Sequence, residues 1–394
     1  MKILALNFNR KGVGTWRRSF YFSRELARAG HEVTLATVSR DSRFRWSECW
    51  KRDWAGESVK ARGPGPWIRV IEGPAWGYQA LPGYGSGPLD IWGRLRELRR
   101  GSYEAVFGFE YQPNVSWPVY LARHTHDFRF FSDWCDWFGG SANRFRGWRI
   151  AHRIDRYFEE RIRFAAETVS VTSRLLAERA RRIGIPAEKI RHIPEGAATD
   201  YIAPLDQREA RLRCKLPAER PLVAAIRQGE MLREMRVFRE VLKRVPNAGF
   251  LMIGSISRAA MAFAEREGMA ERVFPSGWVS NEDYPWFLAA ADVCFCPLDA
   301  SRNDRARWPA KILDFLSAGR ATVTNPVGEV ARLFRESRVG ISSGHAEEEM
   351  GAAIAELLRK PDEARSLGES ARSVMVREWD WRHRGAQIAS MLGS

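Results

Sequence analysis

RARWPAKILDFLSAGRATVTNP, residues 305–326, joins a short apolar helix, a glycine stop and a strand. Pro309 falls where the first turn of a helix tolerates proline. Gly319 ends the helix before a strand-like run that starts at Ala321. The apolar stripe on one side of the helix consists of Ile312, Leu313, Phe315 and Leu316. The stretch predicts a helix-to-strand unit of an α/β fold, with the amino end of the helix directed towards an anion.

Two charged side chains accompany the amino end of this predicted helix. Lys311 adds a full positive charge to the partial charge on the unpaired N–H groups there. Asp314 lies one turn further on, within reach of a ribose hydroxyl. Phosphate and ribose together favour a nucleotide as the ligand. An apolar helix followed by glycine and a strand also occurs in α/β proteins of other functions, so the pattern alone leaves those open.

Strand-like and helix-like segments alternate along most of the chain. A βαβ opening covers residues 2–38, and a second βα series begins at Pro221 after a polar linker at about residues 197–218. Residues 40–90 are rich in Gly, Pro and Trp and show no clear pattern. The alternation predicts an α/β protein with two Rossmann-like domains, whose parallel sheets face each other across a cleft. The expected divisions are an acceptor-binding domain at 1–200, a nucleotide-binding domain at 201–375, and a C-terminal helix at 376–394 that packs back toward the first domain.

Composition excludes a membrane-spanning protein and favours a reducing compartment. No apolar run approaches the roughly 20 residues that span a bilayer. The chain starts directly with a strand-like segment, with no signal-peptide pattern before it. Its five cysteines are odd in number and lack the spacing of a metal site. We therefore expect a cytoplasmic protein.

Positive charge is concentrated in the N-terminal half. Residues 1–200 hold 34 Lys and Arg against 22 Asp and Glu, whereas the remainder holds 29 against 26. The same half holds 11 of the 16 tryptophans. In RFRWSECWKRDW, residues 43–54, Trp46, Trp50 and Trp54 would share one face of a helix. That face would be flanked by Arg43, Arg45, Lys51 and Arg52. It suits either an anionic membrane surface or the protein core.

An ordered series of motifs identifies a family. The first domain opens with GVGTWRRS (12–19) and LARAGHEVTLAT (26–37) and closes with SVTSRLLAERARRIGIPAEKIRHIPEGA (170–197). The second domain contains FPSGWVSNEDYPWFLAAADVCFCPL (274–298). Together with residues 305–326, they resemble the GT-B glycosyltransferases of the retaining family-four group, glycosyl transferases group 1. Glu195 stands where that family usually has Asn, and Ala306 stands where it has the first of two glutamates.

The resemblance implies a donor site in the second domain that binds a nucleotide-diphosphate sugar. Arg227 and Arg233 take the places of the cations that neutralise the diphosphate, although Ile226 replaces a usual Gly. Because Ala306 cannot contact the sugar, the preceding loop becomes the candidate for that role, with Asp299 among its residues. The expected donor-binding residues are Gly14, Arg227, Arg233, Trp278, Val279, Asn303, Arg307, Lys311 and Asp314. For Gly14, a purely structural role in a tight turn stays open. For Arg227 and Arg233, the alternative is that they are solvated loop arginines that bind no ligand.

Two carboxylates of the first domain are candidate catalytic residues. Glu110 stands in GFEY where the family often has a His that contacts the transferred sugar. Asp133, with Asp136, follows another predicted strand in SDWCDW. Such a carboxylate could stabilise an oxocarbenium-like transition state or accept a proton, and a buried structural role is the alternative. The spacing is not an Asp-x-Asp metal motif, so we expect no required metal and no cofactor besides the nucleotide-sugar co-substrate.

The sequence therefore predicts a glycosyltransferase that moves a sugar from a nucleotide-diphosphate donor to a hydroxyl acceptor. Cell-surface polysaccharide or glycolipid synthesis is the expected setting, and the resemblance implies retention of anomeric configuration. Expected partners are a glycan or lipid-linked acceptor and an anionic membrane surface at the inner face of the plasma membrane. Two alternatives are a degenerate transferase that binds without catalysis and a polyanion- or nucleic-acid-binding protein. No nucleic-acid-binding module is visible, so we expect no nucleic-acid partner.

Overall fold

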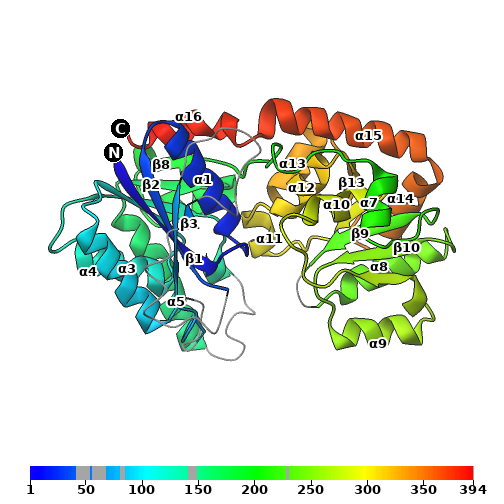
Figure 1. Cartoon of the computed structure of the whole chain (residues 1–394), viewed down its shortest axis with the longest axis horizontal. Helices are drawn as coiled ribbons and strands as arrows, with labels where there is room; N and C mark the ends of the chain where they lie inside the picture. The colour runs from blue at the N-terminus through cyan, green and yellow to red at the C-terminus, as the bar shows by residue number, and fades with distance from the viewer. Residues whose placement is uncertain (41–53, 56–67, 80–84, 141–148, 228–229, 394) are drawn as a thin grey trace. The chain divides into compact units, whose positions relative to one another are not determined.

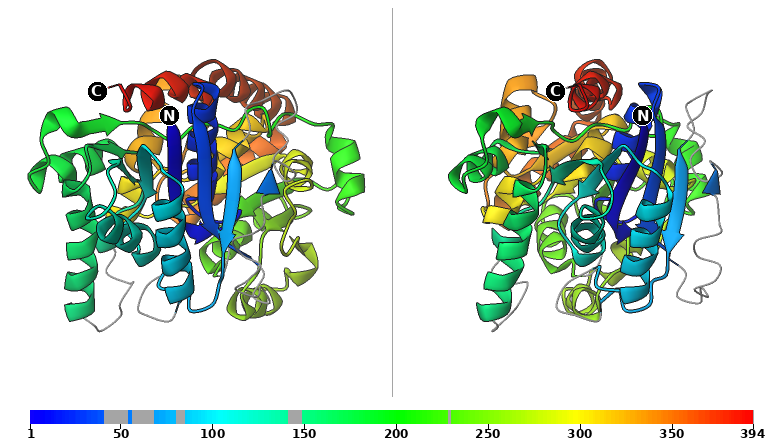
Figure 2. Two further views of the ribbon diagram at one scale, coloured as in Figure 1. Left: turned by 60° about the vertical axis from the view of Figure 1, so that its left-hand side comes forward. Right: turned by 90° about the vertical axis from the view of Figure 1, so that its left-hand side faces the viewer.

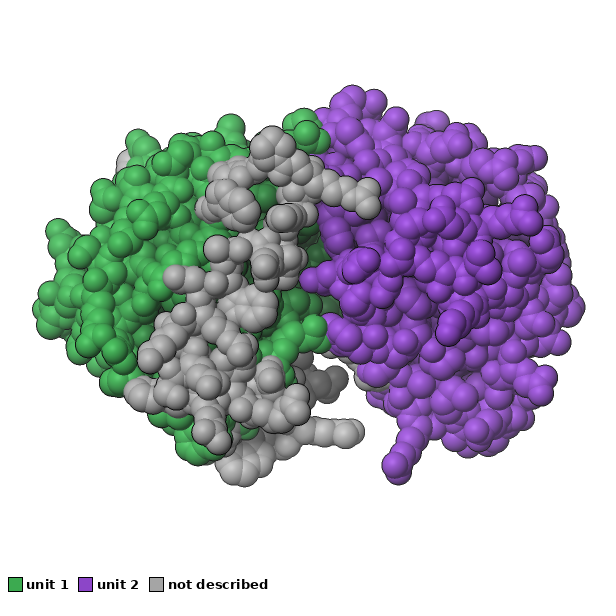
Figure 3. Space-filling view, in the orientation of Figure 1, with its two compact units in different colours: residues 1–195, 301–308, 381–394 green, residues 196–300, 309–380 purple. Residues whose placement is uncertain are grey.

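The computed structural model describes residues 1–40, 54–55, 68–79, 85–140, 149–227 and 230–393. The chain forms two compact units, coloured separately in Figure 3. Unit 1 contains Met1–Glu195, Ser301–Trp308 and Trp381–Ser394, and unit 2 contains Gly196–Ala300 and Pro309–Asp380. Both units are α/β structures, so each buries a sheet beneath helices.

Unit 1 is built on an eight-stranded sheet in the order β3-β4-β2-β1-β5-β6-β7-β8. Its strands are β1 (Lys2–Arg10), β2 (Glu32–Val38), β3 (Trp54–Ala55), β4 (Arg69–Gly73), β5 (Ala105–Phe109), β6 (Arg129–Trp134), β7 (Thr168–Val171) and β8 (Ile190–His192). Neighbouring strands pair in parallel except at β3 and β4, which are antiparallel. Figure 2 shows β1, β2 and β4 side by side. Central strands such as β1 and β5 read as continuous apolar runs because both faces of a parallel sheet are covered.

Helices complete unit 1, and one of them comes from the end of the chain. They are α1 (Trp16–Arg28), α3 (Pro88–Arg100), α4 (Pro113–Ala122), α5 (Arg149–Phe164), α6 (Arg174–Arg182), α11 (Arg302–Ala306) and α16 (Arg382–Ser390), with short 3-10 turns η1 (Phe138–Gly140) and η2 (Ala187–Lys189). α16 packs beside α1 (Figure 1), where Trp381 stacks on Tyr21 with ring centroids 5.7 Å apart. One apolar cluster among the described residues joins β1, β5, α4, α5 and α6.

Unit 2 holds a six-stranded, wholly parallel sheet in the order β11-β10-β9-β12-β13-β14. Its strands are β9 (Leu222–Ile226), β10 (Gly249–Ile253), β11 (Val273–Pro275), β12 (Val293–Cys296), β13 (Ala321–Thr324) and β14 (Ile341–Ser342). Its helices are α7 (Gln207–Arg213), α8 (Leu232–Leu242), α9 (Arg258–Arg266), α10 (Tyr284–Ala290), α12 (Ala310–Ser317), α13 (Gly328–Ser337), α14 (Glu347–Arg359) and α15 (Pro361–Val374), with the 3-10 turn η3 (Ala270–Arg272) and the π-helical turn η4 (Met375–Trp379). The predicted α/β class and the two Rossmann-like units are confirmed.

The stretch at 305–326 folds as its sequence predicts. Pro309 is the N-cap of α12, and all four residues of the predicted apolar stripe are at most 1% exposed. Gly319 has a φ of +69°, a left-handed conformation that a side chain would strain. β13 follows at Ala321. Short-range signals suffice here because the cap, the stripe and the stop lie within one segment.

Three features differ from the sequence-based expectations. The predicted linker at 197–218 contains α7, which Asp206 caps by accepting a hydrogen bond from the amide of Glu209 at 2.7 Å. The region without a clear pattern contains β4 and the first residues of α3, which continues to Arg100. Trp54 lies in β3, so no helix runs through it, while Trp46 and Trp50 lie outside the described residues, as do the four cations predicted to flank them.

Candidate functional site

Several predicted site residues lie at the switch point of each sheet, where the order in which the chain adds strands reverses. In unit 2 the chain builds outward from β9 to β11 on one side and from β12 to β14 on the other. In unit 1 the change falls between β1 and β5. Ligands of open α/β sheets bind outside the carboxyl ends of the strands at such a switch point. Arg227 and Asp299 follow β9 and β12, whereas Gly14 and Glu110 follow β1 and β5.

Two predicted donor-binding cations converge at the end of β9. The ammonium of Lys311, from the first turn of α12, donates to the carbonyl of Ile226 at 3.1 Å. The guanidinium of Arg227, the next residue, donates to the carboxylate of Glu234 at 2.9 Å. Arg227 is 44% exposed, whereas Glu234 is 2% exposed. The buried carboxylate therefore holds one terminal nitrogen of a guanidinium whose side chain remains partly exposed to an anion.

The second predicted arginine spans two loops of unit 2. Arg233 lies in the first turn of α8 and forms an ion pair of 2.5 Å with Asp299, which follows β12. It also lies 3.4 Å from the carbonyl oxygen of His345. The side chain of Asp299 is 72% exposed, so this ion pair is screened by water and weak. An incoming phosphate can therefore replace Asp299 as the partner of Arg233 at small cost.

The remaining donor candidates of unit 2 differ in exposure. The side chain of Trp278, after β11, is 53% exposed, which suits stacking on a base. Val279 beside it is half-buried. Asp314 is only 3% exposed, and one of its oxygens accepts a hydrogen bond of 2.7 Å from the hydroxyl of Tyr284 in α10. The ribose contact predicted for Asp314 stays a prediction.

Gly14 occupies a tight turn between β1 and α1. Its φ is +56°, and a Cβ built there would lie 2.3 Å from the side-chain nitrogen of Asn9. Asn9 in turn donates to the hydroxyl of Thr15 at 3.2 Å. The turn thus requires glycine for its own geometry. Gly14 is also exposed, so its backbone remains accessible at the switch point.

Glu110 holds the loop that follows β6. It is fully buried and has a φ of +71°, an unusual conformation for a residue with a side chain. Its carboxylate accepts hydrogen bonds from the amides of Cys135 and Asp136 at 2.6 and 2.9 Å, and from Arg163 at 3.0 Å. Burial raises the pKa of Glu110 to about 8, and Arg163 opposes that rise.

A second buried carboxylate binds the same loop one turn further on. Glu159 of α5 accepts from the amides of Phe138 and Gly139 at 3.0 and 2.6 Å and from the indole of Trp134 at 3.0 Å. Burial raises the pKa of Glu159 to about 7. Glu110 and Glu159 together engage four backbone amides within residues 135–139. They fix the backbone at Asp136, which is half-buried, whereas Glu110 and Glu159 are fully buried.

Asp133 lies in a buried ion pair. Its two oxygens each accept a hydrogen bond of 2.8 Å from the guanidinium of Arg18 in α1, and the thiol of Cys135 donates at 2.8 Å. Burial opposes ionisation, but Arg18 prevails and lowers the pKa of Asp133. Arg18 also donates to the carbonyl of Ile193 at 2.9 Å and lies 3.6 Å from Glu195. Asp133 and Glu110 are both 0% exposed, so these contacts favour a positioning role, and the catalytic role predicted for them stays a prediction.

Two predicted sugar-binding residues lie in unit 1. Asn303 and Arg307 belong to the segment of α11, which packs on α6 and η1. Arg307 forms an ion pair of 2.6 Å with Asp304. Except for these two and Gly14, the predicted donor residues lie in unit 2. No signal in the sequence indicated that Ser301–Trp308, which follow β12, would belong to unit 1.

Sequence reasoning did not find Glu234, Arg163, Glu159 or Arg18 as parts of the site. Each acts through a partner that is distant in the chain or on a neighbouring turn, and although Arg18 lies within the motif GVGTWRRS, nothing in the sequence marks its role. Among the described residues, no group of three or more His, Cys, Asp or Glu side chains is arranged to hold a metal ion. Within the same residues, no helix combines the length and apolar character needed to cross a membrane.

Comparison with known proteins relates both units to sugar transfer. The model of a glycosyl transferase 4-like domain matches residues 13–196, and that of a glycosyl transferase-like domain matches residues 227–390. The chain is 26% identical over 257 residues to a GDP-mannose-dependent alpha-(1-6)-phosphatidylinositol monomannoside mannosyltransferase of Mycolicibacterium smegmatis. The match covers 62% of this chain and 67% of that relative. The Mycobacterium tuberculosis protein of the same name is 24% identical, over 62% of this chain and 66% of its own length.

Solved structures share the fold over the full chain. Sucrose-phosphate synthase from Thermosynechococcus elongatus superposes with a TM-score of 0.74 at 16% identity, covering 100% of this chain and 98% of that one. HepE of Anabaena, in complex with UDP and glucose, superposes with a TM-score of 0.72 at 14% identity, covering 100% of this chain and 99% of that one. WaaG, a glycosyltransferase involved in lipopolysaccharide biosynthesis, gives 0.71 at 15% identity, covering 100% of both chains. At these identities, the likeness shows the fold alone, an α/β fold with two Rossmann-like units.

Proposed function

Because the chain belongs to the glycosyltransferases of the GT-B fold, we propose that it moves a hexose from a nucleoside-diphosphate sugar to a hydroxyl of a lipid-linked acceptor. The acceptor class follows from the curated relatives, whose names specify a phosphatidylinositol mannoside. The donor class follows from those names and from the UDP and UDP-glucose bound by HepE. Synthesis of a cell-surface glycolipid or polysaccharide is the proposed setting, at the inner face of the plasma membrane.

The observation that carries the proposal is the pair of arginines at the switch point of unit 2. Arg227 and Arg233 both follow β9, one in the loop directly after it and the other in the first turn of α8. The buried Glu234 fixes Arg227, and the exposed Asp299, which follows the neighbouring strand β12, holds Arg233. A diphosphate brings a charge that both guanidinium groups can bind through paired N–H donors. Lys311 and the amino end of α12 add positive potential at the same edge.

These groups supply the electrostatic part of the reaction. The bond between the anomeric carbon and the β-phosphate oxygen breaks, and its electron pair leaves with the nucleoside diphosphate. The acceptor oxygen forms the new bond to the anomeric carbon, and its proton passes to the departing diphosphate. Fixed cations stabilise the negative charge that develops on the leaving group and thereby take the part that a metal plays in other transferases. Retention of configuration is part of the proposal and is supported by the family relationship.

Unit 1 is proposed to bind the acceptor. The loop at 135–139 lies at the carboxyl end of β6 and is held by Glu110 and Glu159, so it presents Asp136 in a fixed direction. Asp136 is the proposed carboxylate for contact with the acceptor hydroxyl, with Glu110 and Asp133 as residues that position the loop. Asn303 and Arg307 are proposed to contact the sugar.

A donor screen tests the proposal. Thermal unfolding with a panel of nucleoside-diphosphate sugars should identify one donor that raises the melting temperature. The same donor should then release nucleoside diphosphate when lipid acceptor is added, and Arg233→Ala should reduce both effects. Stabilisation without release from any donor and acceptor would support a degenerate, binding-only protein. Binding of single-stranded nucleic acid in place of any nucleotide sugar would support a polyanion-binding protein.

A further inference from the structure

The carboxyl end of β1 carries a bulge that side-chain hydrogen bonds hold in place. The register of β1 against β2 shifts before Arg10, the last residue of the strand. Within the bulge, the carbonyl oxygen of Asn9 accepts hydrogen bonds from the side-chain amide of Asn7 at 3.0 Å and from the hydroxyl of Thr37 at 2.8 Å. Bulges at the rim of a sheet redirect the strand and its side chains. This bulge therefore fixes the backbone at Arg10.

Arg10 lies against an aromatic ring that is itself held in place. The central carbon of its guanidinium is 5.2 Å from the ring centroid of Tyr78. Tyr78 is buried, and its hydroxyl donates to the side-chain oxygen of Asn9 at 3.0 Å. A guanidinium over a ring keeps the N–H donors at its edge for other partners, such as a phosphate. Because Arg10 is only half-buried, part of its side chain remains accessible to such a partner.

A second arginine lies close to Arg10, just after the end of β2. Arg40 is exposed and follows Ser39, whose amide donates to the carbonyl of Gly73 in β4 at 2.8 Å. A Cβ built on Gly12 would lie 3.8 Å from a terminal nitrogen of Arg40, which places that nitrogen beside the loop between β1 and α1. Partial burial and the nearby charge of Arg10 lower the pKa of Arg40. The two guanidinium groups therefore repel each other, and an anion bound to both would offset this repulsion.

A neighbouring charged pair at this edge of the sheet is neutral as a whole. Lys11 donates to the carboxylate of Glu72, in β4, at 2.9 Å. Their side chains are only 15% and 7% exposed, so the pair is largely shielded from water. Arg10 and Arg40 add positive charge that this pair does not balance. A phosphate, with its negative charge and several acceptor oxygens, matches two guanidinium groups better than an uncharged sugar does.

We propose that Arg10 and Arg40 bind a phosphate ester carried by the sugar acceptor. The inference rests on the proposed acceptor role of unit 1, and it narrows the acceptor to a sugar or polyol that bears a phosphate. The loop with Asp136 follows β6, which is two strands from β1 and three from β2 in the order β2-β1-β5-β6. Neighbouring strands lie about 4.8 Å apart, so the phosphate would lie about 10 to 14 Å from the proposed contact to the accepting hydroxyl. This separation suits an acceptor with one or two sugar rings between its phosphate and that hydroxyl.

Two kinds of acceptor share this phosphate chemistry. The phosphate of a lipid headgroup is a diester, whereas that of a soluble sugar phosphate is a monoester. The names of the curated relatives specify a phosphatidylinositol mannoside, so inositol esters are suitable probes. Inositol 1-phosphate represents the monoester, glycerophosphoinositol represents the diester without acyl chains, and inositol is the uncharged control.

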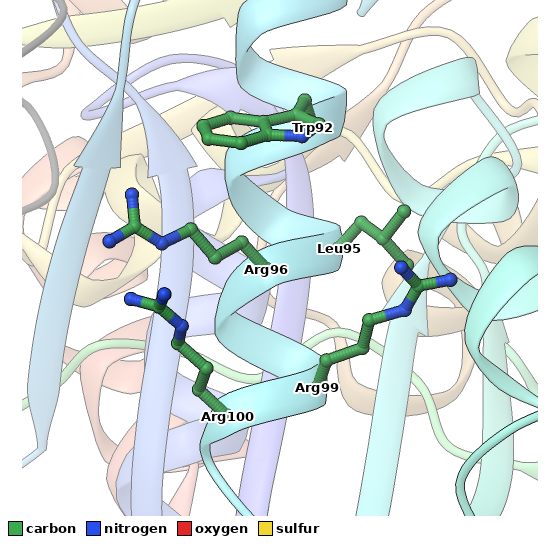
Figure 4. A pocket seen from close by; sticks show the side chains of 5 residues that line it. All are labelled: Trp92, Leu95, Arg96, Arg99 and Arg100. Atoms are coloured by element: carbon green, nitrogen blue, oxygen red, sulfur yellow. The ribbon is translucent and has the colours of Figure 1, made fainter.

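A shallow depression on α3 provides a matched control for positive charge. It is lined by Trp92, Leu95, Arg96, Arg99 and Arg100 (Figure 4). The guanidinium of Arg96 lies 5.6 Å from the ring centroid of Trp92, much as that of Arg10 lies against Tyr78. Figure 4 shows Arg96 and Arg100 extending to the same side of the helix. The double substitution Arg96→Gln with Arg100→Gln therefore removes two arginines, one of them over an aromatic ring, from a helix instead of the strand ends.

Calorimetric titration of the full chain with these probes tests the inference. Arg10→Gln and Arg40→Gln should each weaken binding of the phosphate esters by about 10-fold or more, since each removes a hydrogen bond between charged groups. Because Arg40 is exposed, Arg40→Gln keeps the test valid even where Arg10→Gln disturbs the fold. The α3 double variant should change ester affinity by less than about threefold, because distant charges are screened. All of these variants should bind nucleoside diphosphate as the wild type does.

The two esters identify the source of the phosphate. Preference of the wild type for the diester would indicate a lipid-linked acceptor, and preference for the monoester would indicate a soluble sugar phosphate. Either preference supports the inference. Inositol that binds as tightly as its esters, or the absence of binding by either ester, would overturn it.

The variants separate this site from other sources of binding. Equal losses from the α3 double variant would assign ester binding to the general positive charge and overturn the inference. Loss of ester binding in Arg233→Ala would place the probe in the donor site and would also overturn it, as would loss of nucleoside diphosphate binding in Arg40→Gln. A wild type that binds the esters through Arg10 and Arg40 but binds no nucleoside diphosphate would count against the proposed donor site and leave the phosphate site supported.

Discussion

Replacing Arg233 with Ala should weaken binding of a nucleoside diphosphate without affecting the fold. A hydrogen bond to a charged group contributes about 1.5 to 3 kcal/mol, which corresponds to about 10- to 150-fold in Kd. The partner that the substitution leaves behind, Asp299, is 72% exposed and returns to water at little cost. Arg227→Ala is less informative, because it deprives Glu234, which is 2% exposed, of its ion-pair partner.

Asp299→Asn provides the opposite perturbation at the same ion pair. An exposed ion pair is worth about 0.2 to 1 kcal/mol, so releasing Arg233 from Asp299 should leave diphosphate affinity unchanged or raise it by up to about fivefold. Isothermal titration calorimetry with the nucleoside diphosphate measures both variants. Free nucleoside, which lacks phosphate, is the control ligand and should bind all three proteins equally. Unchanged diphosphate affinity in a folded Arg233→Ala variant would refute the placement of the donor site.

Three further predictions address the base, the metal and the buried ion pair. Trp278→Ala should weaken free nucleoside and nucleoside diphosphate alike, by about 1 to 3 kcal/mol for lost stacking, and calorimetric losses confined to the diphosphate would contradict this. Transfer in excess EDTA should keep most of its rate; complete loss restored by Mn²⁺ would contradict the metal-free mechanism. Asp133→Asn should lower the free energy of unfolding at pH 7 by about 3 to 5 kcal/mol in urea titrations. The folded pKa of Asp133 is lowered, so the difference in the free energy of unfolding between variant and wild type should persist above the unfolded pKa of about 3.9. It should shrink as the pH falls through the folded pKa. A constant difference in the free energy of unfolding down to pH 2 would argue against a stabilising ionised Asp133.

Local signals explain how far the fold could be predicted. The helix at 310–317 carries its apolar stripe and its glycine stop within a dozen residues, and both were predicted from the sequence, whereas Pro309, expected in the first turn, is the N-cap. α3 was missed because its buried side contains charged residues. Arg94 is 0% exposed and forms a 2.9 Å ion pair with Asp90, which in turn accepts from Asn114. An apolar periodicity test cannot detect a helix whose inner face is polar and satisfied by tertiary contacts.

The candidate site was predictable only where a residue type matched a motif. Arg227, Arg233 and Lys311 were predicted from their positions in motifs, and the structure places them at one edge of the unit 2 sheet. The pairing of Arg233 with Asp299 joins residues 66 apart in sequence, and nothing local signals it. Glu110 was found, but the amides that it binds could not be predicted, because they depend on the pairing of β5 with β6.

Formation of a glycosylated lipid with the matching release of nucleoside diphosphate tests the central claim most directly. The purified chain is incubated with the donor found in the thermal screen and with lipid acceptor. Mass spectrometry then follows the lipid, and NMR of the product determines the anomeric configuration. The account predicts one sugar added per diphosphate released, with the configuration of the donor retained, and a lower rate for Arg233→Ala. Binding of the donor with no sugar transferred to any lipid or glycan acceptor would contradict it.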